Sequence, residues 1–122
     1  MDRLFAIVGS FFAMTGIVMG AFGAHLLKER LSSEKLSILE IGIRYQIYHA
    51  LALFVVAWAI SRWPYQSTIS VGWLFIMGVL LFSGSLYLIV LTGQRWLGAI
   101  TPIGGLAMIL GWAILAWVAF RG

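Results

Sequence analysis

Few residues in this sequence are able to do chemistry, and two histidines are the most reactive of them. His25 follows small residues in "GAFGAHLLKER", and His49 lies in "YQIYHALAL". Imidazoles change charge near neutral pH, and two of them at one place can bind a ligand or supply the axial pair of a haem. Which chemistry is available depends on the elements that position the two rings.

The composition indicates an integral membrane protein. Of 122 residues, 62% are hydrophobic and 10% are charged, and the mean hydropathy is +1.03. Such a chain has too little polar surface for a soluble fold of this size. Uncharged runs of the length that crosses a bilayer as a helix occur four times. We predict one all-helical domain over residues 1–122, a four-transmembrane-helix bundle with spans near 4–26, 46–62, 70–91 and 98–120.

The segments between the spans carry helix start and stop signals. Ser32-Ser33 followed by Glu34 predicts a capped amphipathic helix in loop 1 that leads into span two, with apolar residues at spacings of three or four. Gly93 is a plausible terminator of span three. Thr101 before Pro102 predicts either that span four begins there, with Thr101 as the N-cap, or that Pro102 kinks a longer helix.

The charges suggest an orientation and exclude one class of partner. Five basic residues flank loops 1 and 3, against three on the side of the termini. The positive-inside rule therefore predicts that loops 1 and 3 are cytoplasmic and that both termini lie outside. Single, scattered basic residues do not form the concentrated face that nucleic acid requires, so no nucleic-acid partner is expected.

Polar residues of the spans gather in the half nearest loops 1 and 3. Tyr45 and His49 share one helix face, as do Ser83 and Tyr87, because each pair is one turn apart. We predict a small polar pocket open to one side, or else ordinary interfacial side chains. The candidate ligand-binding residues are His25, Tyr45, Gln46, His49, Ser83, Tyr87 and Thr101. No metal site is expected, although His25 and His49 together would suit a haem.

Small residues recur at helical spacing in the first and last spans. They are Gly9, Ala13, Gly16, Gly20 and Ala24 in span one, and Gly104, Gly105 and Gly111 in span four. Such rows let helix backbones approach closely in lipid. They predict helix packing, either inside this chain or between copies in a homo-oligomer or larger membrane complex.

Four motifs, in order, resemble one family of small membrane proteins. They are "GAFGAHLL", "YQIYHALAL", "LFSGSLYLIVLTG" and "ITPIGGLAMILGW". The chain is similar to the YgdD/YwdK-type family, the domain of unknown function 423, which has relatives in the eukaryotic transmembrane protein 256 group. The resemblance implies a four-helix cell-membrane protein and implies no established activity.

Three functions are compatible with these features. The first is a non-enzymatic protein that binds a lipid or small amphiphile, or docks a membrane partner, through the one-sided pocket. The second is a small dimeric transporter or channel, which the lack of Asp and Glu in the spans disfavours. The third is a haem- or quinone-binding redox protein that uses the two histidines. We favour the first, and the cofactor, if any, stays unknown.

Overall fold

The computed structural model describes residues 1–122, apart from the side chain of Ala24. Every element in the described residues is helical. In chain order they are α1 (Asp2–Val18), the π-helical segment η1 (Met19–Gly23), α2 (Ala24–Leu27), α3 (Ser33–Arg62), α4 (Gln66–Thr92), the 3-10 helix η2 (Arg95–Ala99) and α5 (Thr101–Arg121).

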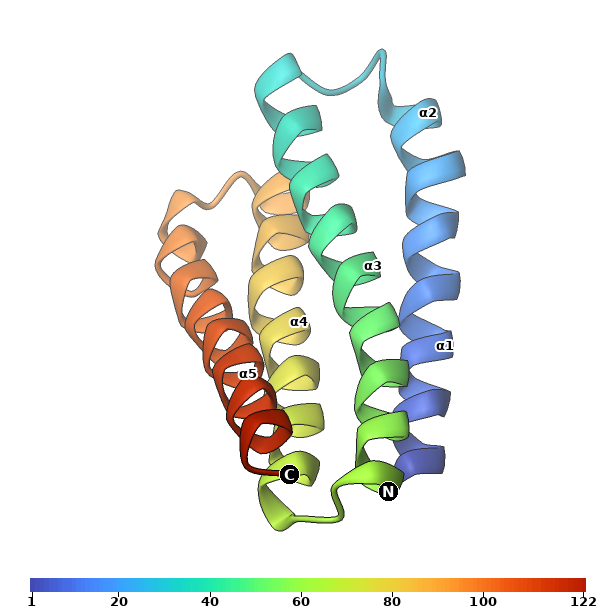
Figure 1. The fold of residues 1–122 in the computed structure, drawn as a ribbon. Helices are drawn as coiled ribbons and strands as arrows, with labels where there is room; N and C mark the ends of the chain where they lie inside the picture. Colours follow the sequence, from blue (N-terminus) through green and yellow to red (C-terminus); the bar gives the residue numbers. More distant parts are fainter.

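Four helical stretches are long and apolar enough to cross a membrane. They are Asp2–Leu27, Ser33–Arg62, Gln66–Thr92 and Arg95–Arg121. Each contains one of the predicted spans, so the all-helical four-span architecture is confirmed. Both termini lie at the same end of the molecule, opposite the loop between α2 and α3 (Figure 1).

The helix in loop 1 and the second span form one continuous helix, α3. The Ser32 hydroxyl oxygen accepts a hydrogen bond from the backbone N–H of Lys35 at 3.2 Å, which caps this helix. The apolar side of its first turns is buried at Leu39 and Ile43. At the end of α4, Gly93 adopts the left-handed conformation with φ 73° and terminates the helix as predicted.

One predicted cap is wrong. Helix α5 begins at Thr101 and Pro102 lies in its first turn, but the Thr101 side chain does not cap it. Its hydroxyl is instead hydrogen-bonded to the Ser85 hydroxyl of α4. The cap position is occupied by Ile100, so Thr101 already lies within the first turn, where its hydroxyl contacts α4.

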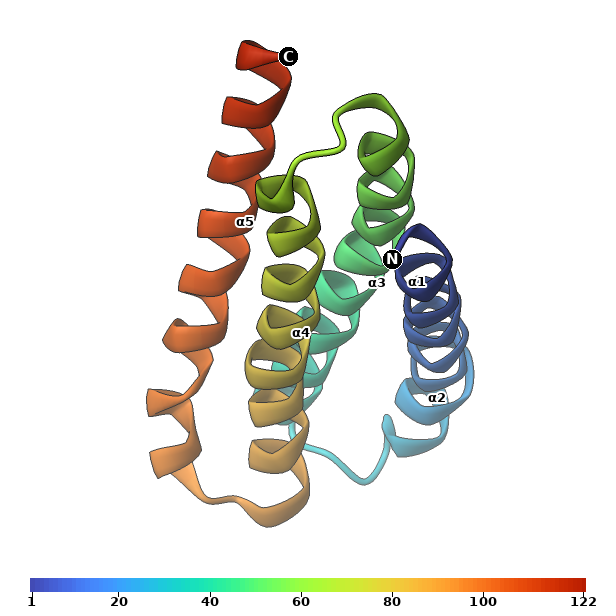
Figure 2. The same ribbon diagram turned by 90° about the horizontal axis from the view of Figure 1, so that it is seen from below.

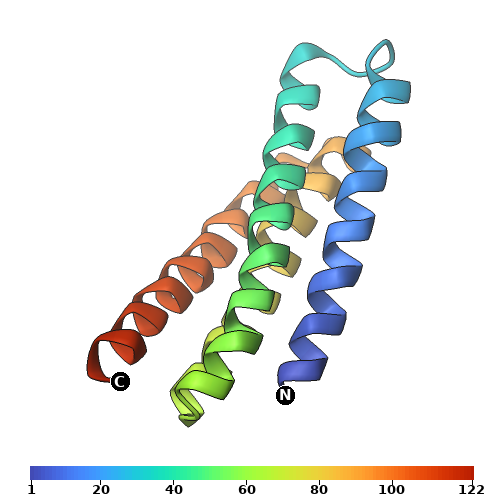
Figure 3. The ribbon, with the colours of Figure 1, turned by 45° about the vertical axis from the view of Figure 1, so that its right-hand side comes forward.

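The spans lie side by side in the order α1, α3, α4, α5. Figures 1 and 2 show α3 between α1 and α4, with α5 on the outer side of α4. The extensive helix contacts are accordingly those of α1 with α3, α3 with α4, and α4 with α5. Figure 3 shows that α5 is inclined to α3. The largest fully buried side chains in this core include Phe5, Phe75 and Leu53.

Glycines allow the close helix contacts. A Cβ atom added at Gly9 would lie 2.8 Å from the Ala50 carbonyl oxygen of α3, and one at Gly16 would lie 2.9 Å from Ile47. Farther along, a Cβ at Gly20 would be 3.5 Å from Ile43, an ordinary contact. The small residues of α1 therefore pack most tightly on α3 near the N-terminus, within the same chain.

Glycines of α5 likewise allow it to pack closely on α4. A Cβ at Gly104 would fall within contact distance of the backbone nitrogen of Phe82, and one at Gly111 would lie 2.6 Å from the Phe75 ring. Gly105 differs, because its nearest neighbour is the Phe82 ring at 3.8 Å. Ala13 is half-buried against the core, and the side chain of Ala24 is outside the described residues.

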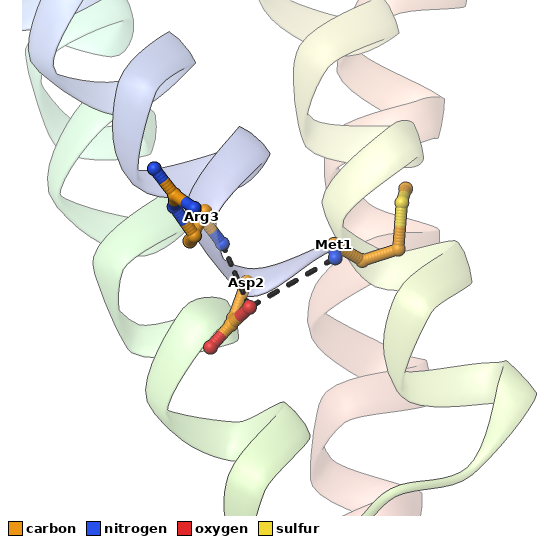
Figure 4. A network of polar contacts seen from close by, with 3 residues as sticks. All are labelled: Met1, Asp2 and Arg3. Carbon is orange, nitrogen blue, oxygen red and sulfur yellow. Dashed lines mark hydrogen bonds and ion pairs between the residues drawn. The ribbon is translucent and has the colours of Figure 1, made fainter.

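Polar contacts complete the end that carries the termini. The Asp2 carboxylate accepts the backbone N–H of Arg3 at 2.8 Å and lies 3.9 Å from the terminal amine (Figure 4). A carboxylate in the first helical turn also interacts favourably with the helix dipole. The guanidinium of Arg121 lies over the ring of Tyr65, 4.2 Å from its centroid, which holds the end of α5 against the loop between α3 and α4.

Candidate functional site

The polar residues predicted to form one pocket divide between two sides of α3. We call the hydrogen-bonded set facing α1 and α4 the Gln46 network; it consists of Thr15, Gln46, Ser83 and Tyr87. The second set lines a cavity between α3 and α5, which we call the α3–α5 groove; its residues are Tyr45, Tyr48, His49, Phe82, Gly105, Met108, Ile109 and Trp112.

The Gln46 side chain connects three helices. Its Nε2 donates to the carbonyl oxygen of Phe12 and to the Thr15 hydroxyl, both at 2.8 Å, and its Oε1 accepts the Tyr87 hydroxyl at 2.7 Å. The amide is 4% exposed. A buried amide in an apolar surrounding is costly unless it is paired, and here both of its donor hydrogens and its oxygen have partners.

Two residues of α4 contact α3 at Gly42. The Ser83 hydroxyl donates to the Gly42 carbonyl oxygen at 2.7 Å. The ring of Tyr87 lies on the same glycine, where an added Cβ would be 2.8 Å from its Cε1. Ser83 and Tyr87 thus share a face of α4, and Gly42 provides the space that lets the tyrosine reach Gln46.

The network surrounds a smaller cavity of about 230 Å³ between α1 and α4. Within the described part of the chain, no buried side-chain nitrogen or oxygen lacks a hydrogen-bond partner. The Gln46 network is therefore satisfied by its own members and by the backbone carbonyls of Phe12 and Gly42, which favours a role in holding α1, α3 and α4 together.

The α3–α5 groove is larger, at about 580 Å³, and its walls are aromatic. Tyr45 and Phe82 have ring centroids 4.7 Å apart, and Tyr45 and Tyr48 are 5.8 Å apart. None of the lining residues carries a formal charge when His49 is neutral. Tyr48 and Ile109 are 54% and 66% exposed, so the groove opens sideways, toward the lipid that surrounds the helices.

His49 lies at the inner wall of the groove with both ring nitrogens occupied. Nδ1 is 2.9 Å from the Tyr45 carbonyl oxygen, and Nε2 is 3.1 Å from Nε1 of Trp112. An indole N–H only donates and a carbonyl oxygen only accepts. The neutral tautomer with hydrogen on Nδ1 satisfies both contacts, with Nε2 as the acceptor. The ring also packs edge-on against Phe75, 5.1 Å between centroids.

His25 is not part of this arrangement, which corrects the expectation that the two imidazoles share a cluster. It is exposed near the end of α2, in a surface depression lined also by Leu26, Lys28 and Glu29. Similar depths in the membrane would allow a pair, but His25 lies on the exposed surface of α2 and His49 lies at the inner wall of the α3–α5 groove. With His49 bound to Trp112 and His25 elsewhere, the two residues do not form an axial haem pair.

Thr101 is also separate from both sets. Its hydroxyl bonds to Ser85, which in turn donates to the Phe82 carbonyl oxygen at 2.9 Å. This contact joins α4 to the start of α5. Among the described residues, no three His, Cys, Asp or Glu side chains gather in a way that would hold a metal ion.

Two residues that the sequence analysis did not select are central to these contacts. Trp112 donates a hydrogen bond to His49. The Gly42 carbonyl oxygen accepts one from Ser83, and the Tyr87 ring packs on the same glycine. Trp112 carried a signal, because it follows Gly105 and Met108 at helical spacing and so lies on their face of the helix. Gly42 gave no such signal, because the Tyr87 ring that fills its space is remote in sequence.

The helices and their satisfied polar contacts define a small four-span, all-helical membrane protein. Comparison with known families agrees, and the chain belongs to the family described as "Protein of unknown function (DUF423)", whose model matches residues 19–105. This result confirms the resemblance carried by the four sequence motifs.

The similarity to known relatives covers nearly the whole chain. The UPF0382 membrane protein YwdK of Bacillus subtilis is 40% identical over 120 residues, covering 98% of each chain. A UPF0382 membrane protein of Staphylococcus epidermidis is 46% identical over 122 residues, covering 98% of this chain and 99% of that protein. No solved structure matches the chain. The names of these relatives state a membrane protein and give no activity.

Proposed function

We propose that this protein binds a lipid-like amphiphile in the α3–α5 groove, as a non-enzymatic protein of the cell membrane. The observation that carries this proposal is the groove itself, a cavity of about 580 Å³ beside an uncharged aromatic wall. Pockets that hold small molecules typically have volumes of about 300–1,000 Å³ and mostly apolar linings with few polar groups.

The position of the groove suits a molecule with one polar end. Tyr45 and Gly105 lie nearest loops 1 and 3, while Trp112 is seven residues farther along α5, about 10 Å deeper at 1.5 Å per residue. Polar atoms are available at both depths, the tyrosine hydroxyls close to the membrane interface and the His49–Trp112 pair farther in, while Met108 and Ile109 favour an apolar chain.

The Gln46 network is a weaker candidate for the ligand site. Its cavity has less than half the volume of the groove, and its polar atoms already bind one another. A ligand there would have to replace the two hydrogen bonds that join Gln46 to α1 and the one that joins it to Tyr87 of α4. In the groove only one hydrogen bond between helices, that from Trp112 to His49, lies in a ligand's way.

Two glycines of this chain provide a variant that fills the groove and a matched control. Gly105→Leu places an apolar side chain in the groove, where a Cβ has only an ordinary 3.8 Å contact. Gly84→Leu adds the same side chain to α4 at a position where a Cβ has no neighbour within 4 Å. Both changes replace a helical glycine, so their effects on helix propensity are alike.

The test is native mass spectrometry of the protein released from its membranes in mild detergent. We expect a small-molecule adduct of one per chain in the wild type and in Gly84→Leu, and loss of that adduct in Gly105→Leu. A wild-type protein without any adduct, or an adduct that Gly105→Leu retains, would contradict binding in the groove.

A further inference from the structure

The chemistry of the groove restricts which amphiphile it can hold. We propose that its ligand is an uncharged amphiphile with a hydroxylated ring, such as an alkyl phenol, whose hydroxyl inserts between Trp112 and His49. This inference rests on the proposed function, because it names the ligand class of the same site.

The first step concerns charge. The eight residues that line the groove include no Lys, Arg, Asp or Glu. A charged group in the apolar region of a membrane is costly unless an opposite charge or polar cavity compensates it. An anionic headgroup would find no such partner in the groove, so the part of the ligand that enters it is uncharged.

The second step concerns shape. Rings from three helices form the walls: Tyr45 and Tyr48 of α3, Phe82 of α4 and Trp112 of α5. The Tyr45 and Phe82 rings are inclined at 34°, and the His49 and Trp112 rings at 63° with centroids 6.0 Å apart. Aromatic side chains interact favourably with other rings in offset or edge-on arrangements. A flat ring therefore uses these walls better than a flexible chain does.

The third step concerns hydrogen bonding. Trp112 presents a donor and His49 presents an acceptor, 3.1 Å apart, and Trp112 is 45% exposed. A ligand that separates them must satisfy both atoms, and a hydroxyl is the small uncharged group that donates and accepts at once. An ether or carbonyl oxygen would satisfy Trp112 alone and would leave Nε2 of His49 without a donor. Leaving such a buried group unpaired weakens binding by about ten-fold or more.

The experiment compares two probes of nearly equal size, 4-dodecylphenol and its methyl ether 4-dodecylanisole, with dodecyl phosphate as the anionic probe. Binding to the purified protein in mild detergent is titrated by native mass spectrometry. We expect the phenol to bind the wild type about ten-fold more tightly than the ether, and dodecyl phosphate to bind more weakly than the phenol.

The variants test which side chain forms the hydrogen bond that distinguishes the phenol from the ether. His49→Leu removes the acceptor, so the phenol and the ether should bind alike. Trp112→Phe removes only the donor and keeps an aromatic ring, so the preference for the phenol should persist. Each result is a ratio of two affinities in one variant, which a partly misfolded fraction does not change. Trp117→Phe, on an exposed part of α5 that does not line the groove, serves as the control.

The outcomes separate this inference from the proposed function. Equal binding of phenol and ether to the wild type, both weakened by Gly105→Leu, would overturn the hydroxyl inference and leave the groove as a binding site. Tighter binding of dodecyl phosphate would overturn the uncharged class. A phenol preference that survives His49→Leu would overturn the role of His49. Failure of every probe, together with the absence of a native adduct, would overturn the proposed function as well.

Discussion

The Gln46 side chain makes three hydrogen bonds, and each of them joins residues more than thirty positions apart in sequence. In lipid the hydrophobic effect does not drive one helix against another, so packing and hydrogen bonds decide which helices associate. The amide binds α1 through Phe12 and Thr15 and binds α4 through Tyr87. It therefore fixes the rotation of α3 relative to both neighbours.

Removal of this amide should destabilise the fold. We expect Gln46→Leu to lower the free energy of unfolding by about 1–3 kcal/mol, because Thr15 and Tyr87 lose their partner in an apolar surrounding. Tyr87→Phe should cost about 1 kcal/mol, since it removes one bond and keeps the ring on Gly42. The measurement is unfolding by sodium dodecyl sulfate in mixed micelles.

The double variant provides the decisive control. If the hydrogen bond between the two residues is stabilising, the cost of Tyr87→Phe should shrink in the Gln46→Leu background. Additive costs would mean that the two side chains do not interact energetically and that the network is only a geometric coincidence.

At this scale the sequence predicted which polar residues share a membrane half and failed to predict which of them meet. Tyr45 and His49 lie one turn apart and do share a face, whereas Gln46 is about 100° from Tyr45 and faces the other side of α3. Which helix covers each face depends on contacts between distant segments. No spacing within α3 contains that information, so one expected pocket became two separate sites.

The helices themselves were predictable because their signals are local. Long uncharged runs, the Ser32 cap and Gly93 each act within a few residues, and each has its expected effect. Thr101 is the exception, because its hydroxyl is bound by Ser85 on another helix. The steric role of Gly104 likewise depends on Phe82, twenty-two positions earlier in the sequence.

Adjacent glycines of α5 should respond differently to one added methyl group. We expect Gly104→Ala to lower the free energy of unfolding by about 1–3 kcal/mol, because its Cβ meets the unyielding backbone of α4. Gly105→Ala should change stability by less than about 0.5 kcal/mol or raise it, since it meets only a ring at ordinary distance and favours the helix.

Unfolding titrations of the two variants in the same detergent make this comparison direct. Equal effects of the two alanines would be inconsistent with close backbone contact between α4 and α5. The two variants also separate packing from binding, because only position 105 lines the groove.

As a whole, the molecule is an arc of four helices with one groove beside α3 and a large lipid-facing surface. The face of α1 turned away from α3 exposes Ile7, Phe11 and Met14 at 63%, 58% and 55%. Neither end is covered by a soluble domain within residues 1–122 as the structure describes them. The groove opens to the side, so we expect the proposed ligand to enter it from the bilayer.

The proposed orientation places loops 1 and 3 in the cytoplasm. It predicts the accessibility of single cysteines, which can be introduced cleanly because the chain has none. Gln66 is the first residue of α4 and Gln94 lies just beyond its last residue, and both are exposed. We expect a membrane-impermeant maleimide to label Gln66→Cys on intact cells and to label Gln94→Cys only after lysis. The reverse pattern would place the termini inside.

The π-helical segment η1 changes which residues of the first span face α3. Its wider turn takes in an additional residue, so the residues after it are rotated by about 100° from the phase of α1. Gly9 and Gly16 face α3 before the segment, whereas Met19 and Gly23 at its two ends and Leu27 after it line the cavity beside Tyr87. Chain length at this point, rather than side-chain type, selects the contact face. A relative one residue shorter here would present a different face of the same helix to α3.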